Sequence, residues 1–136
     1  MQPLATDEYL RQLRSATADL IQAIGGLPDA GATAPSLLPG WTRGHVLTHL
    51  ARNADGGARL LGWARTGVPS YEYESVAARA AEIEQGAHRP AAVLIKDVRN
   101  SADAPFLAWL LRRSDGAGLA RDGDRPLPEV PTVYAT

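Results

Sequence analysis

The stretch TRGHVLTHLARNADGGARLLGWART, residues 42–66, decides the fold of this 136-residue chain. Thr42 is a typical helix N-cap residue, because its hydroxyl can accept a hydrogen bond from a free backbone N–H of the first turn. Apolar residues then recur at helical spacing between residues 46 and 64, and Gly67 and Pro69 end the pattern. The stretch therefore predicts one long amphipathic helix from Thr42 to about Arg65.

The other faces of this helix carry polar groups. One face, which we expect to meet water, consists of Thr48, Arg52, Asp55 and Arg59. On a mixed flank, His45 and His49 stand four residues apart, a spacing that permits joint metal binding. A solvent-facing His45 in the first turn is the plainer interpretation, and the pair lacks the general base of the H-E-x-x-H zinc motif.

Three more helices are predicted, one before and two after this stretch in the sequence. The first follows Thr6 and ends at Gly25, and the Gly- and Pro-rich stretch 27–40 after it is expected to be a loop. Another is capped by Ser75 and runs to about residue 85, and the last opens at Pro90 and runs to about residue 102. No convincing alternating strand occurs, so we predict an all-α bundle with an irregular tail over residues 114–136.

Glu84 and His88 are also four residues apart, near the end of the third predicted helix. Gly86 lies between them and Pro90 follows, so we expect the pair to straddle a helix end rather than share a face. Pro105 is expected to break or kink the last helix.

Composition excludes several classes of protein. The chain has no cysteine, which rules out disulfides, zinc–thiolate knuckles and a cysteine nucleophile, and fits a cytoplasmic location. A net charge of −1 gives no attraction for nucleic acid, so a helix-turn-helix regulator built on the arginines of residues 42–66 is disfavoured. Neither a signal peptide nor an apolar run of membrane-spanning length occurs, and P-loop, Rossmann and G-x-S-x-G motifs are missing.

Residues 38–56, LPGWTRGHVLTHLARNADG, resemble the N-terminal metal-binding domain of mycothiol-dependent maleylpyruvate isomerases, a branch of the DinB-like four-helix bundles. The likeness continues through residues 61–69 and 79–86, and it fades after about residue 100. It implies a DinB-like up-down bundle over residues 1–113, followed by a loop-like tail over residues 114–136.

The resemblance also implies a site. In this family the histidine of the T-H-L element, here His49, is one of three protein ligands of a divalent metal, usually zinc. Arg79 corresponds to an arginine that faces the carboxylates of the substrate. Mycothiol would supply the sulfur for addition to maleylpyruvate, rotation and elimination of fumarylpyruvate, so the resemblance implies a metal- and mycothiol-dependent isomerase or a related thiol transferase acting on a small molecule.

One departure from the family leaves an alternative open. The Glu-x-x-x-His pair that completes the metal site in the family is expected on a helix after Pro131, and the sequence ends at Thr136. We therefore expect a bundle that is incomplete at its C-terminus, in which an exposed core is covered by a homodimer or a partner chain. The alternative function is a non-catalytic helical interaction module.

Overall fold

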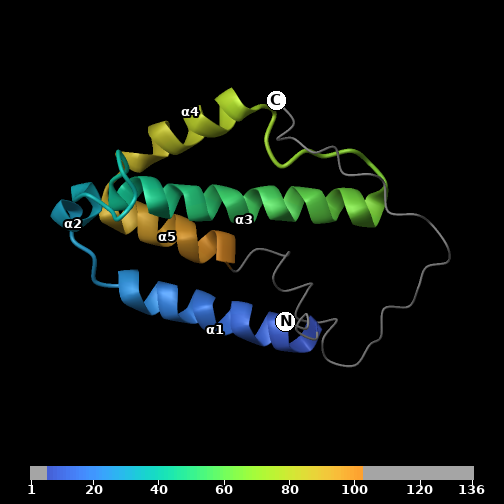
Figure 1. The fold of residues 1–136 in the computed structure, drawn as a ribbon, viewed down its shortest axis with the longest axis horizontal. Coiled ribbons are helices and arrows are strands. Elements are labelled where there is room, and N and C mark those ends of the chain that lie inside the picture. Colours follow the sequence, from blue (N-terminus) through green and yellow to red (C-terminus); the bar gives the residue numbers. More distant parts are fainter. Residues whose placement is uncertain (1–5, 103–136) are drawn as a thin grey trace.

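The computed structural model describes residues 6–102, in which five helices follow one another along the chain (Figure 1). They are α1 (Thr6–Ile24), α2 (Asp29–Thr33), α3 (Arg43–Thr66), α4 (Val76–Ala87) and α5 (Ala91–Ala102). Within these residues the β structure is limited to an isolated bridge between Pro35 and Thr42. The predicted all-α class is confirmed.

The helix boundaries agree with the sequence-based expectations except at two places. The short helix α2 interrupts the predicted loop 27–40, and its Ala32 is buried. The side chain of Asp29 accepts a hydrogen bond from the backbone N–H of Ala91, at 2.8 Å, and so ties α2 to the start of α5. In addition, α4 continues through Gly86 to Ala87 instead of ending near residue 85.

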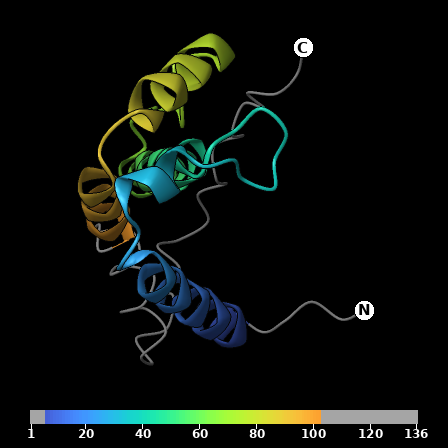
Figure 2. The same ribbon diagram turned by 90° about the vertical axis from the view of Figure 1, so that its left-hand side faces the viewer.

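The long helix α3 is the centre of the bundle. It packs against α2, α4 and α5, whereas α1 lies along α5 on the far side from α4 (Figures 1 and 2). The core cluster lies between these helices and consists of Ile24, Ala32, Leu47, Ala51, Ala91, Leu94, Ile95 and Val98. The predicted apolar face of α3 thus supplies Leu47 and Ala51 to the core.

The expectation that the polar face of α3 meets water is wrong for most of its residues. Thr48 is buried. Arg52 donates to Asp97 of α5 at 2.6 Å, and Asp55 accepts from Ser101 of α5 at 2.9 Å. The helix α5 therefore covers this face through paired polar groups, which a pattern read along α3 alone does not reveal.

No helix within residues 6–102 is long and apolar enough to cross a membrane. The expected break at Pro105, the boundary between residues 113 and 114, and the tail 114–136 lie outside the described residues.

Candidate functional site

His45 is held at the start of α3 by a reciprocal cap. Its backbone N–H donates to the Thr42 hydroxyl at 3.3 Å, and the backbone N–H of Thr42 donates to Nδ1 of His45 at 3.1 Å. These two bonds satisfy N–H groups that a helix start leaves free. The side chain is only 8% exposed, so the expectation of a solvent-facing His45 is wrong.

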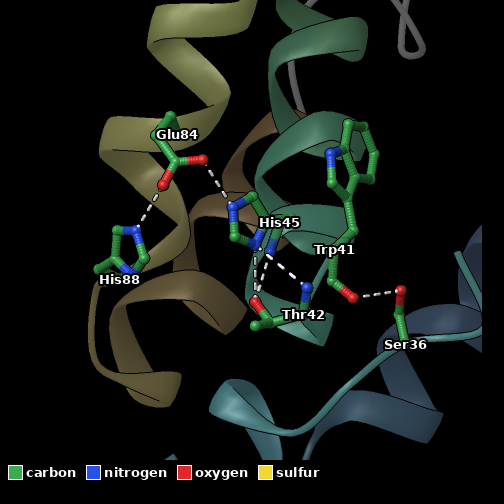
Figure 3. A network of polar contacts seen from close by, with 6 residues as sticks. All are labelled: Ser36, Trp41, Thr42, His45, Glu84 and His88. Atoms are coloured by element: carbon green, nitrogen blue, oxygen red, sulfur yellow. Dashed lines mark hydrogen bonds and ion pairs between the residues drawn. The ribbon is translucent and has the colours of Figure 1, made fainter. Parts of the chain in front are cut away.

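A carboxylate from α4 joins this imidazole to a second one (Figure 3). Glu84 Oε2 lies 2.8 Å from Nε2 of His45, and Glu84 Oε1 lies 2.9 Å from Nε2 of His88. The side chains of Glu84 and His88 are 65% and 67% exposed, so the group opens to solvent on the α4 side. The ligand atoms of the three residues all lie within 4.8 Å of one another.

This contact corrects the expectation that Glu84 and His88 do not share a face. The helix α4 runs on through Gly86 to Ala87 and His88 is its C-cap, so the pair does straddle a helix end as expected, yet the two side chains still meet at 2.9 Å. The Glu-x-x-x-His spacing is the signal in the sequence for this contact, and Gly86 and Pro90 obscure it.

The hydrogen bonds within the group of His45, Glu84 and His88 indicate where its charge and its protons lie. Hydrogen bonds from His88 and then from His45 lower the pKa of Glu84 below its ordinary value, so Glu84 is a carboxylate near neutral pH. Because Nδ1 of His45 accepts the N–H of Thr42, the neutral ring carries its proton on Nε2 and donates it to Glu84. Two imidazoles and one carboxylate form a donor set that suits zinc and similar transition metals.

His49 lies one turn further along α3, and the structure brings it together with Arg79, the other residue named from the family resemblance. Nη2 of Arg79, in the first turn of α4, donates to Nδ1 of His49 at 3.1 Å. Burial, and next the charge of Arg79, lower the pKa of His49, and Glu72 opposes them in part. His49 is therefore a neutral imidazole at physiological pH.

Aromatic rings surround this pair. The indole of Trp41 lies 5.5 Å from the ring of His49 and 6.1 Å from that of His45, between centroids, so it touches both histidine sites. The guanidinium of Arg79 also lies 5.8 Å from the ring centroid of Tyr73, which is buried. Such a ring face attracts a cation and helps to fix the direction of the arginine fork.

Tyr73 also borders a half-open pocket of about 420 Å³. The residues that line the pocket are Arg59, Pro69, Ser70, Tyr71, Tyr73, Glu74 and Glu82. The backbone carbonyls of Tyr71 and Glu72 hold Arg59 in place. Tyr73 thus lines this pocket and also contacts Arg79.

Comparison with known proteins agrees with these features. Residues 13–135 match the model of the mycothiol maleylpyruvate isomerase N-terminal domain. Two solved structures, a mycothiol-dependent maleylpyruvate isomerase and a histidine-to-alanine mutant of it, superpose with a TM-score of 0.73 each, at 30% and 29% identity. The likeness covers 83% of this chain but 46% of those chains, so the present chain spans about half of their length.

No curated protein matches the sequence. The superposition confirms the DinB-like helical fold that the resemblance implied. Because the family model covers nearly the whole sequence, this chain belongs to the family of mycothiol maleylpyruvate isomerase N-terminal domains.

Proposed function

We propose that this chain acts in a metal- and mycothiol-dependent cis–trans isomerisation of the maleylpyruvate type, or in a related thiol transfer. In this proposal His49 is a ligand of a divalent cation, expected to be zinc, and Arg79 faces the carboxylates of the substrate. The contact between Arg79 and His49, in a chain of this family, is the observation that carries the proposal.

His49 fits the role of one ligand. A metal-binding imidazole must be neutral, and the lowered pKa of His49 keeps it so. Within residues 6–102, the group of three metal-ligating donors is that of His45, Glu84 and His88, so further ligands of a cation on His49 would come from residues outside this range.

Arg79 and a cation compete for the same ring. At present Nδ1 accepts a hydrogen bond from Arg79, which leaves the ring proton on Nε2. If Nδ1 of His49 held the cation, Arg79 would lose this acceptor, and if Nε2 held it, the ring proton would move to Nδ1, which would then no longer accept. In either case Arg79 would be released, and its planar fork would be available for a carboxylate.

The remaining chemistry would come from groups that the chain does not contain. A bound divalent cation would lower the pKa of the thiol that mycothiol, the thiol named for this family, would supply. Mycothiol would supply a thiolate that adds to the conjugated double bond, permits rotation about the resulting single bond and leaves again as the same thiolate, so that no net bond is made or broken. Arg79 would hold the dianionic substrate in place throughout.

Isomerisation of maleylpyruvate, with mycothiol and Zn²⁺ added, tests the proposal. We expect His49→Ala to reduce kcat/KM by at least about a hundredfold and to lower the zinc content of the purified protein. Arg79→Ala should mainly raise KM, and Arg79→Lys should restore part of it because the charge remains. A wild-type chain that takes up no metal, or a His49→Ala variant with full activity, contradicts the proposal.

The alternative function, a helical interaction module, is favoured by one observation. Leu37 and Leu38, in the loop between α2 and α3, are exposed, and Leu37 fully so. If a homodimer covers the exposed part of the core, sedimentation should show self-association of the chain. A strictly monomeric, well-folded species contradicts the interaction module.

For both candidate functions we propose a cytoplasmic location, because the chain lacks cysteine.

A further inference from the structure

We infer that His45, Glu84 and His88 form a second divalent-cation site, separate from His49, which takes Zn²⁺ or a similar first-row transition metal. A cation bound there would link the start of α3 to the end of α4. It involves neither of the two residues named in the proposed function, and its own test does not depend on catalysis.

The distances between the donors are close to those of a tetrahedral metal site. Ligands at about 2.0–2.1 Å from a tetrahedral zinc ion are about 3.3 Å apart. In this structure Oε2 of Glu84 lies 2.8 Å from Nε2 of His45, Oε1 of Glu84 lies 2.9 Å from Nε2 of His88, and the ligand atoms of the three residues all lie within 4.8 Å of one another. The two imidazole–carboxylate pairs must therefore separate by about half an ångström, and Glu84 and His88 must turn so that all three donors face one point. The exposed side chains of Glu84 and His88 can make this adjustment by small rotations, while buried His45 stays fixed.

The hydrogen bonds of His45 already provide for the change of tautomer that metal binding requires. A cation on Nε2 moves the ring proton to Nδ1, where it needs an acceptor. The hydroxyl oxygen of Thr42 lies 2.8 Å from Nδ1 and can accept it. The same hydroxyl keeps its bond from the His45 backbone N–H, so this half of the helix cap survives, whereas the bond from the Thr42 N–H to Nδ1 is lost. The Thr42 hydroxyl oxygen would thus orient the ring of His45, as the hydrogen-bond acceptors behind metal-bound histidines do.

The surrounding charges favour a cation at this group. Glu84 contributes a negative charge, because an exposed glutamate is a carboxylate at neutral pH. Arg89, the arginine that follows His88 directly, turns away: Nε donates to the Gly86 carbonyl and Nη2 to Asp97, at 2.8 and 2.7 Å. His49 differs, because the charge of Arg79 lies directly on its ring. A cation entering this part of the bundle therefore meets attraction at Glu84 and repulsion at Arg79.

The donor set also indicates which cations bind. Imidazole nitrogens suit zinc, cobalt, nickel and copper, whereas magnesium and calcium prefer a shell made of oxygen alone. Three protein ligands would leave a fourth position for water, and the exposure of Glu84 and His88 gives water access to the group.

Thermal unfolding of the full, chelator-treated chain tests the site, with ZnCl₂ as the probe. A ligand that binds the folded state alone raises Tm. We expect Zn²⁺ to raise the Tm of the wild type, while the same concentration of Mg²⁺ leaves it unchanged. Glu84→Gln and His88→Asn should weaken zinc binding at this site by more than about tenfold in calorimetric titration and reduce the Tm shift, and any shift that remains would come from a cation on His49. Both altered side chains are exposed, so the variants should fold.

Two control variants keep the test specific. Glu82→Gln removes an exposed carboxylate from the same helix and should bind zinc like the wild type. His49→Ala should also keep the Tm shift, although the proposed function predicts that it loses activity. Loss of the shift in His49→Ala with retention in Glu84→Gln overturns the second site and leaves the proposed function standing.

A direct measurement comes from the nitrogen chemical shifts of the imidazoles. In the metal-free chain we expect the proton of His45 on Nε2, and after addition of Zn²⁺ on Nδ1. A His45 ring whose tautomer does not respond to Zn²⁺ contradicts the inference, even if zinc binds elsewhere on the surface.

Discussion

Gly44, at the start of α3, lies so close to the backbone carbonyl of Ala87 that a Cβ on residue 44 would overlap that carbonyl oxygen. The obstacle is backbone at the end of α4, which cannot turn aside as a flexible side chain can. This close approach explains how the next residue, His45, comes within hydrogen-bond distance of Glu84. A glycine thus sets the spacing of the two helices at the candidate metal centre.

Gly44→Ala should therefore destabilise the chain by about 1–3 kcal/mol, because α4 must move away from α3. Gly62→Ala is the matched control on the same helix, since a Cβ there would meet nothing within 4 Å. Replacement of a helical glycine by alanine at an open position stabilises by about 0.5–1 kcal/mol. Chemical denaturation of both variants measures the difference, and equal effects of the two changes would contradict the close packing.

Arg79→Ala should raise the pKa of His49 toward its ordinary value in the metal-free chain, because it removes the second largest cause of the lowering. Burial, the largest cause, remains, so the rise should be partial. Arg79→Lys keeps the charge and should keep most of the lowering. Titration of the histidine ring signals by NMR measures all three values, and an unchanged pKa in Arg79→Ala would show that the two residues do not interact in solution.

The same lowering predicts how stability depends on pH. Between the depressed pKa of folded His49 and its ordinary value of about 6.5, the unfolded chain binds more protons than the folded chain. The contribution of His49 to the free energy of unfolding therefore rises with pH across that window and is complete above it. A comparison of the wild type with His49→Gln, by denaturation at several pH values below 7, isolates this contribution.

Asp97→Asn should cost about 1–3 kcal/mol of stability. Asp97 accepts from Arg52 and Arg89 on its two oxygens, at 2.6 and 2.7 Å, and all three side chains are largely buried. The change removes the carboxylate that the two guanidinium groups share, and Arg52 keeps its ion pair to Asp55, at 3.0 Å. Glu8→Gln serves as the control, because the ion pair of Glu8 with Arg11 is solvent-exposed and its loss should leave the unfolding transition unchanged.

Leu94→Ala should cost about 2–5 kcal/mol, since Leu94 is completely buried in the core cluster and its loss leaves a cavity. Its neighbour Val93 is 45% exposed, so Val93→Ala should change stability by less than about 1 kcal/mol. Guanidinium unfolding of the two variants compares them directly. Similar losses would mean that α5 buries a different face.

Most of the fold could be predicted because it depends on local signals. Thr42 and Ser75 cap helices as expected, and Gly67 ends α3 with the positive φ of 75° that glycine adopts readily. The short α2 was missed because five residues carry too little periodicity to be distinguished from a turn.

The candidate site was harder to predict, because its residues meet through packing. Gly86 suggested a helix end, yet α4 continues through it, and a Cβ there would meet the methyl group of Thr48. Close approach of α3 thus outweighs the small helix propensity of glycine. The contact of Glu84 with His45 spans 39 residues, and helical spacing carries no information about such a distance. The metal role of His49 and the substrate role of Arg79, taken from the family resemblance, stay predictions.

The reciprocal cap at the start of α3 has a consequence for local motion. Helix ends normally fray, but the first turn here is tied down by an imidazole that is itself anchored on another helix. The backbone amide of His45 should therefore exchange with deuterated solvent more slowly than the backbone amide of Ala78. The Ala78 amide donates to the corresponding cap of α4, the exposed Ser75 hydroxyl.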